Sequence, residues 1–239
     1  MYFSKKAIIV QDNCLLVEGY TDVISFHQAG IENVVSASGT SLTEDQIRLI
    51  KRITPNITVL FDGDAAGIKA SFRSIDLILQ EGMNVRVVLF PEGQDPDSYA
   101  KGVTSEELKT FLTEESKDFI SFKADLLLDE AAGDPVRKAR IVKDIVASIS
   151  VMPDAIVRSM YLRECSKLMD ISEQILVNEM NKAKGSGGYG RTNSYANSGN
   201  TPARSAIQTA PQTSNNKTAK SDPQERDLIR FLLNYGDMG

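Results

Sequence analysis

The chain has 239 residues, of which 41% are hydrophobic and 25% charged, a composition typical of globular proteins with a substantial core. The formal net charge of −5 argues against a general nucleic-acid binder, which usually carries a basic excess. The sequence shows neither a signal peptide nor an apolar run of the roughly 18–20 residues that span a membrane. We therefore expect a cytoplasmic protein without membrane contact.

The cysteine and histidine content excludes a zinc site built from these residues. Cys14 and Cys165 lie far apart, and His27 is the only histidine. A structural zinc ion takes about four such ligands at close spacing, so we expect no zinc in this chain. Both thiols are expected to be reduced and buried, and His27 is expected to be a packing or surface residue.

Residues 1–102 alternate β-rich runs with helical patterns. The predicted strands are Cys14–Val17, Val34–Val35, Ile57–Phe61 and Val85–Phe90, and the predicted helices are Thr21–Ala29, Thr43–Arg52 and Ala65–Gln80. Thr43 and Gln46 have the spacing of a capping box, and Gly30 and Gly82 are expected to end helices. This alternation predicts an α/β fold with a mostly parallel sheet flanked by helices, which binds ligands at the carboxyl ends of its strands.

The rest of the chain divides into three parts. Residues 103–184 are predicted to form a helical subdomain, with helices at Lys117–Glu130, Pro135–Ser150, Asp154–Met169 and Ser172–Ala183. Residues 185–221 are rich in Gly, Ser, Asn, Thr and Gln and contain no acid, which predicts a flexible linker. Residues 222–239 begin with Asp222-Pro223 and an apolar pattern, which predicts the first helix of a further, truncated domain.

Acidic residues follow the predicted strands of the first region. Glu18 comes directly after the first strand, Asp62-Gly63-Asp64 after the third, and Asp95-Pro96-Asp97 follows the fourth by a short loop. Since parallel strands share one carboxyl edge, these acids are expected to converge, with Asp22 beside them. Clustered carboxylates raise each other's pKa unless cations balance them. Mg²⁺ provides such a balance, and paired ions support phosphoryl transfer.

Each acidic motif also has an ordinary structural interpretation. Asp-Gly is a common turn, Asp64 has the position of a cap for the next helix, and Asp95-Pro96-Asp97 reads as an exposed loop. The occurrence of all three motifs at successive strand ends favours the metal site.

The longer motifs resemble a known family. Glu18-Gly19-Tyr20-x-Asp22 and Asp62-Gly63-Asp64 resemble the two signatures of the Toprim fold, which primases, topoisomerases and some nucleases share. Ala37-Ser38-Gly39-Thr40-Ser41-Leu42-Thr43 and Asp95-Pro96-Asp97 resemble the bacterial DnaG-type primases in particular. The resemblance extends from residue 1 to about residue 180.

The resemblance implies a role for each matched position. Glu18, Asp62 and Asp64 would be the catalytic metal ligands, and Asp22, Asp95 and Asp97 would complete the acidic cluster. Gly39 and Thr40 would shape a loop beside the pocket. Lys69 and Arg73 would approach phosphates, although a solvated helix face is the simpler interpretation for both.

The implied activity is metal-dependent, template-directed synthesis of short RNA primers, with two or more Mg²⁺ or Mn²⁺ ions. The implied partners are single-stranded DNA, ribonucleoside triphosphates and the replicative helicase. The zinc module and the basic subdomain of such primases are missing, so we expect a fragment that binds metal but synthesises primers weakly. A Toprim-type nuclease and a non-catalytic helicase-tethering module are the alternatives.

Overall fold

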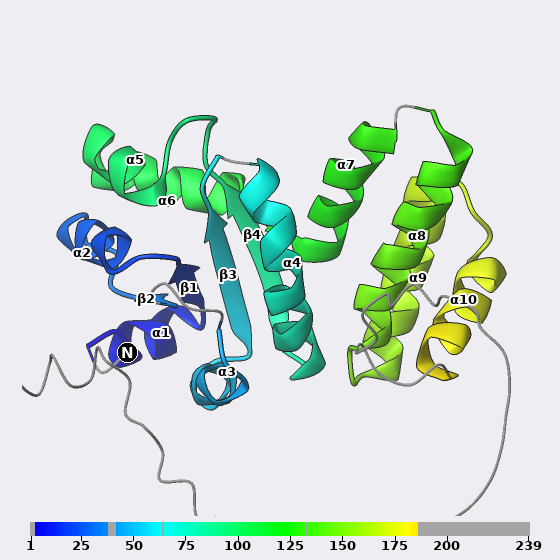
Figure 1. Ribbon diagram of the computed structural model, residues 1–239. Helices are drawn as coiled ribbons and strands as arrows, with labels where there is room; N and C mark the ends of the chain where they lie inside the picture. The colour runs from blue at the N-terminus through cyan, green and yellow to red at the C-terminus, as the bar shows by residue number, and fades with distance from the viewer. Residues whose placement is uncertain (1–2, 38–41, 64, 132, 186–239) are drawn as a thin grey trace, which may run out of the picture. The chain divides into compact units, whose positions relative to one another are not determined.

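The computed structural model describes residues 3–37, 42–63, 65–131 and 133–185. These residues form a sheet with the strand order β2-β1-β3-β4-β5 (Figure 1). The strands are β1 Cys14–Val17, β2 Val34–Ser36, β3 Asn56–Phe61, β4 Asn84–Leu89 and β5 Lys117–Asp118. The first four strands are parallel, and β5 is antiparallel to β4. The mostly parallel sheet predicted from the sequence is confirmed.

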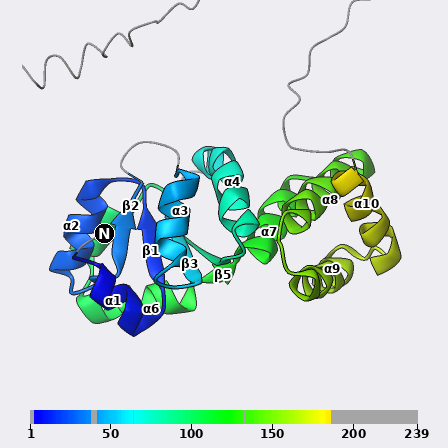
Figure 2. The ribbon, with the colours of Figure 1, turned by 90° about the horizontal axis from the view of Figure 1, so that it is seen from below.

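Helices cover both faces of this sheet. Their bounds are α1 Lys5–Gln11, α2 Tyr20–Gln28, α3 Glu44–Lys51, α4 Ala65–Gln80, α5 Pro96–Gly102, α6 Ser105–Glu114, α7 Phe119–Ala131, α8 Pro135–Ser150, α9 Ala155–Met169 and α10 Glu173–Gly185. Phe26, Ala100 and Leu108 bring α2, α5 and α6 into one apolar cluster with the sheet. Figure 2 shows α3 and α4 on the other side of the sheet from α6.

The strands are buried on both faces, which explains their nearly continuous apolar sequences. Leu16 and Val59 pack into the cluster that holds α3 and α4, whereas Leu15 and Leu60 pack into the opposite cluster. This alternation is the period of two that every β-strand imposes on its side chains. Each fully buried side chain of this size contributes about 1.5–3 kcal/mol, so the two clusters fix the register of the strands.

The core on the α4 side continues from the sheet into the C-terminal helices. Phe72 of α4 packs edge-to-face against Phe119 of α7, with ring centroids 5.6 Å apart. Ile145 of α8 and Leu162 of α9 belong to the same apolar cluster as Phe72. The sheet and helices α7–α10 therefore share one core within the described residues.

Several local predictions are confirmed at residue level. Thr43 caps α3 in a capping box, because its hydroxyl accepts from the Gln46 N–H and the Gln46 side chain accepts from the Thr43 N–H. Gly30 and Gly82 follow α2 and α4 with φ of 75° and 74°, a left-handed backbone that favours glycine.

The predicted helix start at Lys117 is wrong. Lys117 and Asp118 form the short strand β5, in which Asp118 lies opposite Arg86 of β4. The Asp118 carboxylate accepts hydrogen bonds from the Ile120 and Ser121 N–H groups, so it caps the helix that starts at Phe119. Because Lys117 and Asp118 pair with β4, which is distant in the sequence, α7 starts two residues later than predicted.

Three helices were not predicted individually, namely α1, α5 and α6. Helix α6 falls within the region expected to be a helical subdomain, yet Phe111 of α6 packs on Phe90 and Tyr99 beside the sheet. Cys14 and Cys165 are both free and buried, as expected, and burial raises the pKa of each thiol to about 12. The predicted linker beyond Gly185, which still belongs to α10, and the segment 222–239 lie outside the described residues. Among the described residues, no helix has the length and apolarity to cross a membrane.

Candidate active site

Two acids emerge from neighbouring strands at the carboxyl edge of the sheet. Glu18 follows β1 directly and Asp62 follows β3 directly. The two strands are paired in parallel, with Leu16 opposite Val59, so both acids leave the sheet at the same edge. Adjacent strands lie about 4.8 Å apart, which is close enough for two carboxylates to reach one ion. Glu18 is exposed and Asp62 is half-buried.

Gly63 fixes the chain directly after Asp62. Its N–H donates to the Gln94 carbonyl at 3.1 Å, which ties the end of β3 to the loop that follows β4. A Cβ at this position would overlap the Pro91 carbonyl and lie 2.8 Å from the Cα of Glu92. The Asp62 backbone can therefore lie against this loop only because residue 63 is glycine.

Asp22 lies in the first turn of α2 and is 8% exposed. Its Oδ2 accepts from the Gly19 N–H at 3.0 Å, which closes the turn between β1 and α2. Burial raises the pKa of Asp22 more than this hydrogen bond lowers it, and the negative charges of Asp95 and Asp97 add to the increase. Asp22 therefore holds the turn at the end of β1, close enough to Asp95 and Asp97 to feel their charges.

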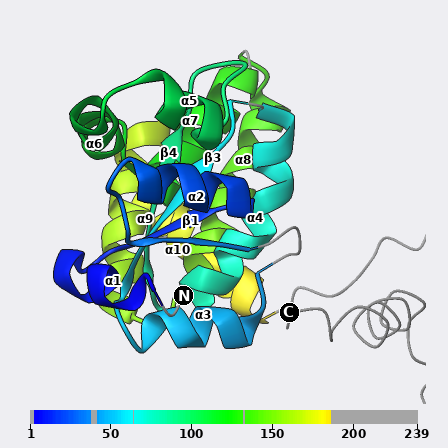
Figure 3. The same cartoon turned by 90° about the vertical axis from the view of Figure 1, so that its left-hand side faces the viewer.

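Asp95 and Asp97 lie at the start of α5, which packs beside α2 (Figure 3). Asp95 is the N-cap, and its Oδ1 accepts from the Ser98 N–H at 2.7 Å. Asp97 is ion-paired with Lys101 at 2.7 Å and accepts from the Ser25 hydroxyl. Ser98 lowers the pKa of Asp95, and the hydrogen bonds from Lys101 and then Ser25 lower the pKa of Asp97.

The predicted acids thus fall into two groups at one end of the sheet. Glu18 and Asp62 lie at the strand ends, and the Glu18 side chain has no hydrogen bond or ion pair with any described residue. Asp22, Asp95 and Asp97 lie where α2 meets α5, and each accepts hydrogen bonds from the protein. The metal roles predicted for these residues remain predictions.

Other predicted site residues are described in part or not at all. Asp64, Gly39 and Thr40 lie outside the described residues. Lys69 lies on α4, but its side chain is not described, and Arg73 is exposed on the same helix. The phosphate-binding role of both side chains stays a prediction.

Two residues that bind Asp97 were not predicted from the sequence. The Ser25 hydroxyl of α2 donates to Asp97 Oδ1, and the Lys101 ammonium of α5 donates to Asp97 Oδ2. The spacing of four residues between Asp97 and Lys101 was a usable signal, because such pairs meet on one face of a helix. The Ser25 contact spans 72 residues and left no local signal.

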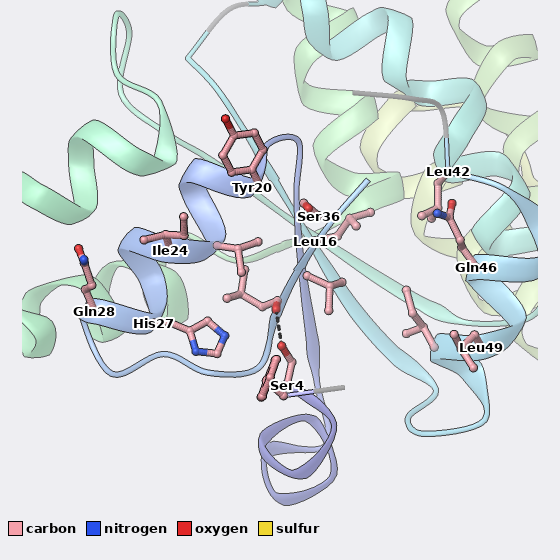
Figure 4. Close-up of a pocket in the computed structure, with 15 residues that line it drawn as sticks. Ser4, Leu16, Tyr20, Ile24, His27, Gln28, Ser36, Leu42, Gln46 and Leu49 are labelled. Atoms are coloured by element: carbon pink, nitrogen blue, oxygen red, sulfur yellow. Dashed lines mark hydrogen bonds between the residues drawn. The ribbon is translucent and has the colours of Figure 1, made fainter. Parts of the chain in front are cut away.

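The cavity beside the edge strand β2 is a different feature. It has a volume of about 780 Å³ and lies among α1, α2 and α3 (Figure 4). His27 lines it, and so do Ser4 and Val34, which are joined by a hydrogen bond of 2.8 Å from the Ser4 hydroxyl to the Val34 carbonyl. None of the described side chains that line it is a carboxylate, so they offer no charged oxygen ligand for a hard divalent cation.

The strand-end acids suit a magnesium ion of the kind that acts on phosphates. Mg²⁺ is usually held by one or two carboxylates, while water and substrate phosphates supply its other ligands. Glu18 and Asp62 provide two carboxylates, and the exposure of Glu18 leaves room for water and phosphate. Among the described residues, no group of three or more acids, cysteines or histidines is close enough to hold a metal by itself. The pair fits an open site that substrate completes.

Comparison with known proteins gives matches in two separate segments. Residues 15–100 match a family model described as Toprim-like, and residues 123–174 match the DnaB-helicase binding domain of primase. A DNA primase of Staphylococcus aureus is 34% identical over 177 residues. That alignment covers 74% of this chain and 29% of the relative, so the chain spans less than a third of the length of this curated relative.

Solved structures with the same fold are also primase domains. A DNA primase domain from Pseudomonas aeruginosa superposes with a TM-score of 0.66 and 27% identity, covering 75% of this chain and 57% of that structure. The DnaG primase catalytic domain bound to single-stranded DNA gives a TM-score of 0.58 and 29% identity, covering 65% of this chain and 51% of that structure.

The parallel sheet with acids at its carboxyl edge, together with the match over residues 15–100, makes this a Toprim protein. Within that class, the chain belongs to the DnaG-type bacterial DNA primase family. The helicase-binding match covers most of α7 and all of α8 and α9, whereas the sequence pattern predicted the start of such a domain at residues 222–239.

Proposed function

We propose that the acidic edge of this chain catalyses template-directed synthesis of short RNA primers. The observation that carries the proposal is the placement of Glu18 and Asp62 directly after two adjacent parallel strands. In the proposed reaction, the 3′-hydroxyl of the growing primer attacks the α-phosphate of a ribonucleoside triphosphate, and pyrophosphate leaves. Single-stranded DNA is the proposed template, since a related catalytic domain was solved with it.

The proposed roles of the side chains follow from their positions. Glu18 and Asp62 would hold Mg²⁺ or Mn²⁺, with Asp64 as a third ligand. When bound, such ions stabilise negative charge on the phosphates of the transition state. Gly63 keeps Asp62 against the 91–94 loop. Asp22 closes the turn that connects Glu18 to α2. Positioning of this kind accounts for most of the catalysis in phosphoryl transfer, because the protein performs little covalent chemistry there.

A nucleotide-incorporation assay separates this proposal from the nuclease alternative. The chain is incubated with single-stranded DNA, labelled ribonucleoside triphosphates and Mn²⁺. We expect slow but template-dependent incorporation and an intact template, because the same acids would serve attack by a ribonucleotide hydroxyl and not by water. Cleavage of the DNA without incorporation would identify a nuclease instead.

We further propose that α9 contacts the replicative helicase. Helix α9 lies within the segment that matches the helicase-binding model, and Ile156 and Met160 are 73% and 69% exposed on it. Their spacing of four residues places both on one face of the helix. Exposed apolar side chains grouped on one helix face are typical of a protein interface.

The helicase contact is tested by replacing Met160→Asp. A charge at an apolar contact is expected to weaken helicase binding at least about tenfold, the usual cost of losing an interface hot spot. Val10→Asp is the matched control, since Val10 is 76% exposed on α1, outside the helicase-binding match. Calorimetric titration with the helicase measures both variants. Equal affinities for the two variants would remove α9 from the interface.

A further inference from the structure

A buried lysine lies between the sheet and the C-terminal helices. Lys123 of α7 is only 4% exposed. Its Nζ donates to the Ser148 hydroxyl of α8 at 2.7 Å and lies 3.3 Å from the Asp144 carbonyl. It also lies 5.1 Å from the centre of the Phe72 ring of α4. One ammonium group thus touches α4 and α8 from its position on α7.

Asp76 of α4 completes the group. Ser148 and the positive charge of Lys123 both lower the pKa of its carboxyl group, so this carboxylate lies near both side chains. Its Oδ1 is buried and has no hydrogen-bond partner among the described residues. Burial raises the pKa of Asp76 and lowers that of Lys123, so both ionised forms are disfavoured unless the two charges stay together. Ser148 is fully buried, accepts from Lys123 and also stabilises the ionised form of Asp76.

Apolar packing alone does not require this group. Phe72, Phe119 and Ile145 already join α4, α7 and α8 in one core. A buried ion pair is often no more stabilising than apolar residues of the same size, whereas removal of one partner is strongly unfavourable. We call Lys123, Ser148 and Asp76 the relay. Its hydrogen bonds are directional, whereas packing contacts are not, so the relay specifies one position of α4 relative to α7 and α8.

Helix α4 connects this relay to the acidic edge. It begins at Ala65, directly after Asp62-Gly63-Asp64, and Asp76 lies roughly 16 Å further along its axis. The other end of the relay is on α7 and α8, which lie largely within the segment that matches the helicase-binding model. A stiff helix therefore runs between the strand-end acids and the helical region.

We infer that the Lys123–Ser148–Asp76 relay positions α4, and through it Asp62, and so couples the helicase-binding helices to the catalytic edge. The inference rests on the proposed metal role of Glu18 and Asp62. Lys123, Ser148 and Asp76 are positioning residues, since none of them lies at the strand ends. Coupling between two sites is reciprocal. If the relay transmits changes from α8 to the acidic edge, Mn²⁺ bound at that edge must also stabilise α8, which slows hydrogen exchange of the α8 backbone.

The test combines hydrogen exchange with Mn²⁺ titration of the whole chain. Lys123→Met keeps the length of the side chain and removes its charge. We expect faster exchange in residues 65–80, loss of the Mn²⁺-induced protection of α8, and Mn²⁺ affinity lowered at least about fivefold, the lower end of typical coupling between sites. Asp76→Asn, which keeps size and hydrogen-bonding capacity, is the second variant and is expected to act in the same direction if Lys123→Met folds poorly.

Leu176→Ala is the matched control, because Leu176 is fully buried on α10 and lies outside the relay. It should loosen α8 and α10 without changing exchange in residues 65–80 or Mn²⁺ affinity. If both relay variants behave like Leu176→Ala, or keep the Mn²⁺ affinity of the unaltered chain, the relay is structural only and the inference is overturned. If the unaltered chain binds no Mn²⁺, the proposed function fails and the inference fails with it.

Discussion

Replacement of Asp62 by Asn is expected to lower Mn²⁺ affinity at least about tenfold, because the loss of an outer-shell partner alone already costs about 10–100-fold. Nucleotide incorporation is expected to fall about 10²–10³-fold, or roughly 3–4 kcal/mol of transition-state stabilisation. The reason is that Asp62 is one of two described carboxylates at adjacent strand ends, and an amide carries no charge to attract the ion. Paramagnetic resonance of free Mn²⁺ and incorporation of labelled nucleotide measure the two effects.

Asp95→Asn is the matched control for this substitution. Asp95 lies at the same end of the sheet, but its Oδ1 caps α5 by accepting from Ser98. Asn is as good a cap as Asp, so the helix should remain stable. We expect Mn²⁺ affinity to stay within about twofold of the unaltered chain, less than the effect of an outer-shell partner. An equal loss in both variants would mean that the two groups of acids form a single metal site.

Replacement of Gly63 by Ala is expected to lower the free energy of unfolding by about 1–3 kcal/mol, the usual cost of overpacking. The upper part of this range applies because the added Cβ meets the backbone of Pro91 and Glu92, which cannot move aside as a flexible side chain does. Relief of the overlap displaces the chain at Asp62, so Mn²⁺ affinity should fall as well. Denaturant unfolding and Mn²⁺ titration measure both effects.

Gly102→Ala provides the comparison for Gly63→Ala. Gly102 ends α5, and a Cβ there meets no atom within 4 Å. In the Gly102→Ala variant, the free energy of unfolding should change by no more than about 0.5 kcal/mol, as for most surface substitutions. If Gly63→Ala is as mild as Gly102→Ala, the close contact between the end of β3 and the 91–94 loop does not hold Asp62 in place.

The sequence predicted the parallel sheet because its strands are buried on both faces. Runs such as Ile57–Phe61 are apolar at nearly every position, and a helical pattern follows each run. The short strand β5 could not be predicted, because two residues carry no periodicity and their pairing with Arg86 and Val87 is tertiary. Helix α1 was missed as well, since seven residues at the edge of the sheet give a weak pattern.

The shared edge of Glu18 and Asp62 could be predicted from the sequence, whereas the convergence of all the acids into one metal site stays a prediction, since no three of the described acids lie close enough to hold an ion. Strand order alone places Glu18 and Asp62 at one edge, since both follow parallel strands. The part played by Asp95 was visible in the sequence, because Ser98 follows at the spacing of a capping box, but the motif was assigned to the metal-binding cluster, with an exposed loop as the alternative. The contact between Ser25 and Asp97 depends on how α2 packs against α5, which no local pattern encodes.

Lys123 shows a different limit of sequence reasoning. Lysine is almost never fully buried, so its position in an amphipathic helix predicts a solvated side chain. It is buried here because Ser148 and Asp76 reach it from two other helices. Such a group is recognised only once α4, α7 and α8 are placed together.

A crystal of the chain soaked in Mn²⁺ tests most directly whether Glu18 and Asp62 share a divalent ion. Anomalous scattering is expected to place an ion about 2.1 Å from a carboxylate oxygen of each residue, the distance typical of small divalent cations. An ion bound only at Asp95 and Asp97, or carboxylates of Glu18 and Asp62 too far apart to share one, would contradict the proposed active site.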